Sequence, residues 1–127
     1  MLKWGAVGTR IVIIDDDPSF LVTVRALLER EGFVVAGDAL NGLDGVAAVA
    51  ELAPDIVLVD VNLPDIDGFE VVDRLGDGAG APPAVLTSSR AAGDFGKLVE
   101  TSRARGFITK ADITGKALAE FLERGAT

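Results

Sequence analysis

The sequence predicts one α/β domain in which helices cover both faces of a five-stranded parallel sheet. Five short apolar runs alternate along the chain with amphipathic stretches, and this alternation is typical of consecutive strand and helix units around a buried parallel sheet. The length of 127 residues fits a single domain. Hydrophobic residues make up 49% of the chain and charged residues 25%, which favours a folded domain over a disordered chain.

The five apolar runs are the expected strands, and they lie at residues 10–14, 33–37, 55–59, 84–86 and 106–109. None of them is long enough to cross a bilayer, and the first ten residues contain no apolar core of the kind that a signal peptide has. We therefore expect a cytoplasmic domain over residues 10–124, with an N-terminal extension at 1–9 and a short tail at 125–127.

The first helix is expected directly after the first strand. Asp17 can serve as its N-cap, Pro18 suits the first helical position, and Gly32 is suited to end it. The helical spacing then places five apolar residues on one buried face, which are Phe20, Leu21, Val24, Leu27 and Leu28.

The later elements are less regular. Residues 75–83 are rich in glycine and proline and predict a surface loop before the fourth strand. Gly93 and Gly96 weaken the fourth helix, because each glycine costs about 1 kcal/mol relative to alanine inside a helix. The last helix is expected to begin near Asp112 and to bury Ile113, Ala117, Leu118, Phe121 and Leu122.

Composition excludes several kinds of chemistry. The chain has no cysteine and no histidine, so it can form neither a disulfide, nor a thiolate or imidazole metal site, nor a Ser-His-Asp triad. Twelve basic residues against twenty acidic ones give a net charge of −8, which repels nucleic acids and anionic lipid surfaces. We expect no direct nucleic-acid binding and no membrane insertion.

Polar residues follow four of the five expected strands. The carboxyl ends of the strands form the ligand-binding edge of an open parallel sheet, so we expect these side chains to meet there. They are Asp15, Asp16 and Asp17 after the first strand, Asp60 after the third, Thr87, Ser88 and Ser89 after the fourth, and Thr109 and Lys110 after the fifth.

The carboxylates at this edge predict a metal site. Asp15, Asp16 and Asp60 would repel one another in a partly desolvated cleft unless a divalent cation lay between them. Ligands that are all oxygen favour Mg²⁺ or a similar hard ion. Asp17 is better explained as the cap of the first helix.

Three roles are open for Asp60 on this reasoning. It could be a metal ligand only, a nucleophile that accepts a phosphoryl group, or a strand-end cap without chemistry. If it accepts a phosphoryl group, Thr87 could donate a hydrogen bond to one phosphoryl oxygen and Lys110 could neutralise another.

Five segments make the sequence similar to a known family: IVIIDDDP, ALNGLDG, PDIVLVDVNLPDIDGFEVV, AVLTSSR and GFITKADI. The chain resembles the receiver domains of response regulators in two-component signalling, over almost its whole length. The resemblance implies a doubly wound, flavodoxin-like three-layer sandwich whose sheet has the strand order 2-1-3-4-5.

The resemblance also implies a role for each site residue. Asp60 would be the phospho-acceptor, Asp15 and Asp16 would hold Mg²⁺ together with Asp60 and the backbone carbonyl of Asn62, and Lys110 would contact the phosphoryl group. Thr87 and Phe107 would be the switch residues, and Asn62, Ser88 and Ser89 would modulate the lifetime of the phosphorylated state. Many receivers have a proline after the lysine, whereas Ala111 stands there, so we expect a trans peptide bond.

The function implied is a phosphorylation switch that catalyses only its own phosphoryl transfer and dephosphorylation. A histidine kinase or a histidine phosphotransfer protein would supply the phosphoryl group. The surface of the fourth helix, fifth strand and fifth helix would then bind a target protein, and a homodimer is compatible with the sequence. The first choice is a free-standing receiver that acts through protein contacts.

Four alternatives remain. The chain could be the receiver part of a longer DNA-binding regulator, or an interaction module that is not phosphorylated. A phosphohydrolase is disfavoured because Asn62 stands where a second acid is needed, and a flavodoxin-like electron carrier because DDDPS replaces a phosphate-binding loop.

Overall fold

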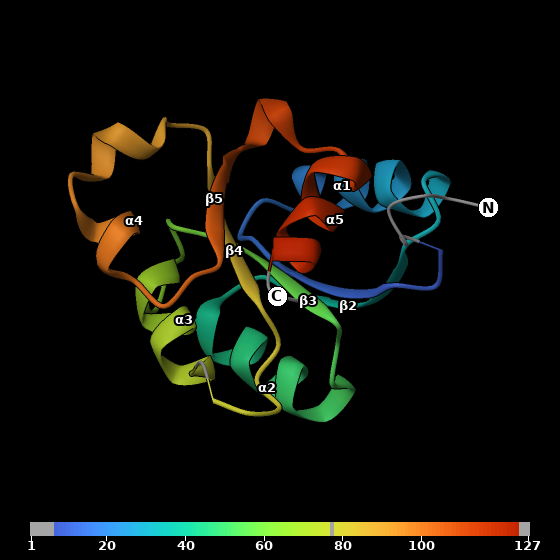
Figure 1. Cartoon of the computed structure of the whole chain (residues 1–127), viewed down its shortest axis with the longest axis horizontal. Helices are drawn as coiled ribbons and strands as arrows, with labels where there is room; N and C mark the ends of the chain where they lie inside the picture. The colour runs from blue at the N-terminus through green and yellow to red at the C-terminus, as the bar shows by residue number, and fades with distance from the viewer. Residues whose placement is uncertain (1–6, 77, 125–127) are drawn as a thin grey trace.

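A computed structural model describes residues 7–76 and 78–124. These residues form one sheet of five parallel strands, with helices packed around it (Figure 1). The strands are β1 (Arg10–Ile14), β2 (Val34–Ala39), β3 (Ile56–Asp60), β4 (Ala84–Ser88) and β5 (Gly106–Thr109). Their order across the sheet is β2-β1-β3-β4-β5, which confirms the expected topology. The expected tail at 125–127 and most of the N-terminal extension, residues 1–6, lie outside the described residues.

Helices cover both faces of the sheet (Figure 1). On one face lie α1 (Pro18–Arg30) and α5 (Gly115–Arg124), and on the other lie α2 (Gly42–Leu52) and α3 (Gly68–Leu75). The short helix α4 (Leu98–Thr101) follows a 3-10 turn, η1 (Ala92–Phe95), and a second 3-10 turn, η2 (Lys110–Asp112), follows β5. The result is the three-layer sandwich that the sequence predicts.

The core is divided by the sheet into two apolar clusters. In β3 every residue is buried, with Ile56 and Leu58 in the cluster under α1 and α5, and Val57 and Val59 in the cluster under α2 and α3. Each such side chain stabilises the fold by about 1.5–3 kcal/mol when it is fully buried. The central strands are therefore a rigid base for the residues at their carboxyl ends.

The first helix begins and ends as predicted. The Asp17 carboxylate accepts a hydrogen bond from the Ser19 N–H at 3.0 Å, and Pro18 occupies the first turn. The helix ends at Arg30, and Gly32 then adopts a φ of 99°, which glycine tolerates better than any other residue.

The last helix begins later than predicted. Asp112 belongs to η2, where its carboxylate accepts a hydrogen bond from the Thr109 hydroxyl at 2.6 Å. The Thr114 hydroxyl accepts from the Ala117 N–H at 3.0 Å and caps α5 instead. The predicted apolar residues are nevertheless all buried or partly buried against the core.

Three strands also differ from their predicted bounds: β2 is Val34–Ala39 and not 33–37, β3 is Ile56–Asp60 and not 55–59, and β4 is Ala84–Ser88 and not 84–86. β3 ends at Asp60 because Asp60 still pairs with Thr87 of β4. β2 begins at Val34 because the Phe33 N–H still bonds to the Leu28 carbonyl at the end of α1. β4 extends to Ser88 because Thr87 and Ser88 pair with Ile108 and Thr109 of β5.

The predicted weakness of the fourth helix is confirmed. Its segment is divided into η1 and the four-residue α4, and Gly96 between them has a φ of 60°. Residue 76 and residues 78–83 form no helix or strand between α3 and β4, as the glycine and proline content predicts, but Leu75, which was expected in the loop, is the last residue of α3.

Candidate functional site

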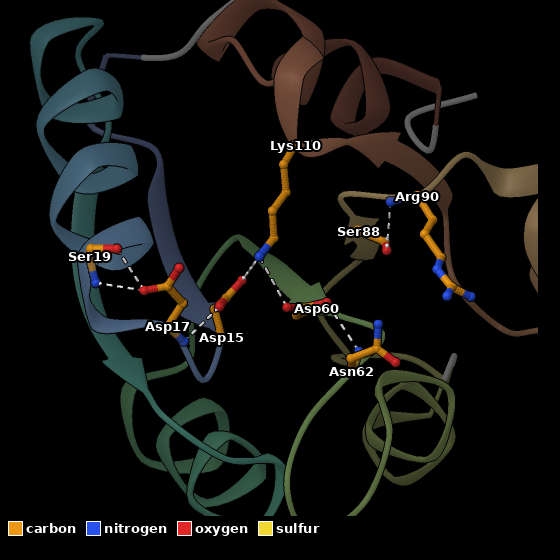
Figure 2. A network of polar contacts seen from close by, with 8 residues as sticks. All are labelled: Asp15, Asp17, Ser19, Asp60, Asn62, Ser88, Arg90 and Lys110. Carbon is orange, nitrogen blue, oxygen red and sulfur yellow. Dashed lines mark hydrogen bonds and ion pairs between the residues drawn. The ribbon is translucent and has the colours of Figure 1, made fainter.

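The strand register brings the predicted residues to one edge of the sheet. Asp60 is paired with Thr87 across β3 and β4, and Thr87 is paired with Ile108 of β5. Asp15 directly follows β1, and Lys110 directly follows β5. Figure 2 shows the Lys110 side chain reaching from the turn η2, directly after β5, to a point between Asp15 and Asp60.

Three carboxylates form an acidic cluster at this edge. One oxygen from each of Asp15, Asp16 and Asp60 lies within 4.8 Å of the others. Asp15 is fully buried and Asp60 is 5% exposed, whereas Asp16 faces solvent. The cluster therefore has a buried base and an open side through which an ion or a phosphoryl group can enter.

Lys110 is the cation of the site. Its Nζ lies 2.8 Å from Asp15 Oδ2 and 3.1 Å from Asp60 Oδ2. The ammonium also lies 4.2 Å from the centre of the Phe20 ring, which is within the range of a cation–π contact. The lysine is thus held by two carboxylates and an aromatic ring.

Burial and ion pairing shift the pKa values of this pair. Burial raises the pKa of Asp15 above its ordinary value, although the hydrogen bonds from Lys110 and from the Asp17 N–H oppose the shift. For Lys110, burial alone would lower the pKa, but the contacts with Asp15 and Asp60 outweigh it and raise the pKa. Lys110 is therefore charged at neutral pH.

The charges and donors of the site fit a divalent cation. Three carboxylates face one ammonium, which leaves two negative charges uncompensated when all are ionised. The ligands available are all oxygens, which suits Mg²⁺. These observations agree with the metal site that the sequence predicts.

Thr87 carries a second indication of a ligand. The residue is 1% exposed, and its hydroxyl has no hydrogen-bond partner in the part of the chain that the structure describes. A buried hydroxyl without a partner costs about 1–3 kcal/mol. The arrangement suits a ligand oxygen that arrives beside Asp60.

The predicted modulating residues differ in their surroundings. The Asn62 N–H donates to Asp60 Oδ1 at 3.1 Å, and its side chain is exposed. The Ser88 hydroxyl is buried and accepts from the Arg90 N–H at 3.1 Å (Figure 2), whereas Ser89 is exposed. The metal contact of the Asn62 carbonyl and the effects of these residues on lifetime stay predictions.

Phe107 lies half-buried in β5 and belongs to a chain of three aromatic rings. Its ring centroid is 5.9 Å from that of Phe95 in η1, which is 6.1 Å from that of Phe69 in α3. Phe69 and Phe95 could not be predicted as partners of Phe107 from the sequence, because contacts between elements so far apart leave no local pattern. The described residues contain no cis peptide bond, so the bond between Lys110 and Ala111 is trans as expected.

Comparisons with known proteins agree on one family. The chain matches the response regulator receiver domain family over residues 11–122. It is 38% identical over 102 residues to BvgA of Bordetella pertussis, a transcription regulator of virulence factors, covering 80% of this chain and 48% of BvgA. It is 34% identical over 116 residues to a protein-glutamate methylesterase/protein-glutamine glutaminase of Myxococcus xanthus, covering 91% of this chain and 32% of that protein.

A solved structure extends the comparison to the fold. A two-component response regulator of the LuxR family from an Aurantimonas species has a TM-score of 0.78 and 26% identity, over 92% of this chain and 84% of that chain. This chain spans half or less of the length of the two relatives above. No helix among the described residues is long and apolar enough to span a membrane. By sequence, fold and site, the chain belongs to the family of response regulator receiver domains, the signalling switches of two-component systems.

Proposed function

We propose that this domain is switched by phosphorylation of Asp60. The observation that carries the proposal is the grouping of a nearly buried strand-end carboxylate, a lysine 3.1 Å from it and a buried threonine hydroxyl without a partner in the described chain. An idle strand-end carboxylate would need neither of these neighbours. A phosphoryl group on Asp60 would use both of them.

The phosphoryl transfer follows from this arrangement. A carboxylate oxygen of Asp60 attacks the phosphorus of a phosphohistidine on a kinase or phosphotransfer protein, the P–N bond breaks, and an acyl phosphate forms. Lys110 neutralises charge on the phosphoryl oxygens. Asp15, Asp16 and Asp60, with the Asn62 carbonyl, would hold Mg²⁺, which supplies further charge neutralisation when bound.

The switch would act through Thr87 and Phe107. The Thr87 hydroxyl donates a hydrogen bond to a phosphoryl oxygen and so gains the partner that it lacks. Phe107 then changes its packing against Phe95, and the surface of α4, β5 and α5 shifts toward a second conformation. The size of the shift is limited by how differently the phosphoryl group interacts with the two conformations.

Hydrolysis of the acyl phosphate would reset the switch. Asn62 and Ser89 are exposed beside the site, so water reaches the phosphoryl group and the phosphorylated state has a moderate lifetime. Bulky substitutions at both positions should lengthen the lifetime, and an unchanged lifetime would contradict open access.

The output of the switch has two candidates. A free-standing receiver that binds a target protein through α4, β5 and α5 is the first. The second is the receiver of a longer DNA-binding regulator, and it is favoured by BvgA, a transcription regulator that is about twice as long as the matched segment. In the second case nucleic-acid binding belongs to another domain, because the net charge of −8 repels phosphate backbones.

Intact mass spectrometry tests the proposed phosphorylation. The purified protein is incubated with a small-molecule phosphodonor and Mg²⁺, beside Asp60→Asn and a sample with a chelator. We expect one phosphoryl adduct on the wild type and none in either control. An adduct that persists in Asp60→Asn would overturn the assignment of Asp60.

A further inference from the structure

The loop that follows Asp60 is tied to the start of α2 by one carboxylate. Asp65 Oδ1 accepts a hydrogen bond from the Gly42 N–H, and Asp65 Oδ2 accepts one from the Leu43 N–H, each at 2.8 Å. These two N–H groups belong to the first turn of a helix and have no partner within it. The bond from Leu43 contributes most to lowering the pKa of Asp65 to about 2, so the carboxylate is ionised at neutral pH.

Apolar packing strengthens the same junction. A Cβ on Gly42 would lie 2.5 Å from Ile66 Cγ1, so the helix approaches the loop as closely as a glycine permits. A Cβ on Gly45 would lie 2.5 Å from Ile14 Cδ1, and Ile14 directly precedes Asp15. The first turn of α2 therefore packs against both chain segments that carry the acidic cluster.

Asp65 is not needed as an ordinary cap of α2. That helix has its own N-cap in Asn41, whose side chain accepts from the Asp44 N–H and donates to the Asp44 carboxylate, both at 2.8 Å. Among the described residues, the Asp44 carboxylate thus bonds within its own turn, whereas the Asp65 carboxylate joins α2 to a segment 22 residues away.

We propose that Asp65 is a positioning residue that sets the Mg²⁺ affinity of the site by holding the loop 61–67 against α2. The inference rests on the proposed function, because the loop includes Asn62, whose carbonyl is a predicted ligand. Without the two hydrogen bonds, the loop would sample positions that do not support the metal. Groups that orient metal ligands typically change affinity by about 10- to 100-fold, and a loop anchor should have a smaller effect.

Mg²⁺ titration of the unphosphorylated chain by isothermal calorimetry tests this proposal. We expect Asp65→Ala to weaken Mg²⁺ binding by about three- to tenfold, somewhat less than for a group that orients a ligand directly. Asp65→Asn, which keeps one acceptor oxygen, should restore part of the affinity. Asp44→Ala is the matched control, since it removes an equal charge from the same helical turn. The Mg²⁺ affinity of this variant should stay within about twofold of the wild type, which is less than the loss expected for Asp65→Ala.

The outcomes separate this proposal from the proposed function. If Asp65→Ala and Asp44→Ala lost Mg²⁺ affinity equally, the loss would reflect only the negative charge removed near the start of α2, and the positioning role would be overturned. An unchanged Mg²⁺ affinity in Asp65→Ala would overturn it as well. Absence of Mg²⁺ binding in the wild type would refute the metal site itself. Thermal unfolding without Mg²⁺ shows whether the variants are folded at the temperature of the titration. If Asp65→Ala does not fold, Asp65→Asn takes its place as the test variant.

Discussion

Asp15 is a buried carboxylate whose ionisation works against the fold. Burial raises its pKa above the ordinary value of 3.8 even though Lys110 lies 2.8 Å away. A carboxyl group with a raised pKa in the folded state favours folding when protonated, and this contribution is lost as the pH rises from the unfolded pKa through the folded one. The fold therefore carries a cost at neutral pH that the proposed metal site explains.

Asp15→Asn should therefore increase the free energy of unfolding at neutral pH in the absence of Mg²⁺. The gain should shrink as the pH falls through the folded pKa toward 3.8, and it should vanish well below 3.8, where the wild-type carboxyl is protonated in both states. Urea unfolding at several pH values measures the difference. A gain that persists unchanged at low pH would show that packing, and not ionisation, is responsible.

Thr87→Val should also stabilise the unphosphorylated domain, by about 1 kcal/mol, since it removes a buried hydroxyl without a described partner. The same variant should accept a phosphoryl group but fail to change its surface, because the hydrogen bond to the phosphoryl oxygen is gone. Urea unfolding and NMR spectra with and without phosphodonor measure the two effects. A destabilised Thr87→Val would indicate that the hydroxyl has a partner in the folded protein.

At the scale of elements, the segment from η1 to α4 is the part best suited to move. It consists of a 3-10 turn and a four-residue helix separated by Gly96 and Lys97, and none of its residues is buried. Phe95 of this segment packs against the apolar cluster under α2 and α3, and its ring pairs with those of Phe69 in α3 and Phe107 in β5. Phe95 therefore links the segment to the predicted switch aromatic.

Phe95→Ala should destabilise this segment more than the rest of the domain. Each aromatic pair is worth about 0.5–1.5 kcal/mol beyond its buried area, so loss of two pairs should cost about 1–3 kcal/mol. Hydrogen exchange should then accelerate over residues 92–101 while β3 stays protected. Leu98→Ala, at a side chain that is 56% exposed, is the control, and equal acceleration in it would argue against the aromatic link.

The elements also show how far sequence reasoning reaches. The positions of Asp15, Asp60, Thr87 and Lys110 could be predicted because they directly follow or end buried strands, and the strand pattern is local. The predicted start of α5 was wrong because Asp112 and Thr114 are both acceptable N-caps in the sequence. In the structure the Asp112 carboxylate bonds to Thr109 within the turn η2, and Thr114 is left to cap the helix. Asp65 and Phe95 were missed because their partners lie on other elements, where no residue spacing indicates them.

At the scale of the whole molecule, the acidic site is part of a chain whose net charge is −8. A ligand that binds only the folded state stabilises it by mass action, by about 2.7 kcal/mol when its concentration is 100 times the Kd. Mg²⁺ should therefore raise the thermal unfolding midpoint of the wild type, and removal of the Mg²⁺ with a chelator should reverse the rise. Asp60→Asn should lose most of this response, and a full response in that variant would place the ion elsewhere.

The central claim is that Asp60 accepts the phosphoryl group, and chemical mapping tests it most directly. The domain is treated with a small-molecule phosphodonor and Mg²⁺, reduced with borohydride, which converts an acyl phosphate to a homoserine residue, and digested with trypsin. Cleavage at Arg25 and Arg30 separates Asp15 and Asp16 from Asp60, so fragment sequencing distinguishes them. We predict homoserine at position 60 alone, and homoserine at position 15 or 16 with Asp60 unmodified would contradict the assignment.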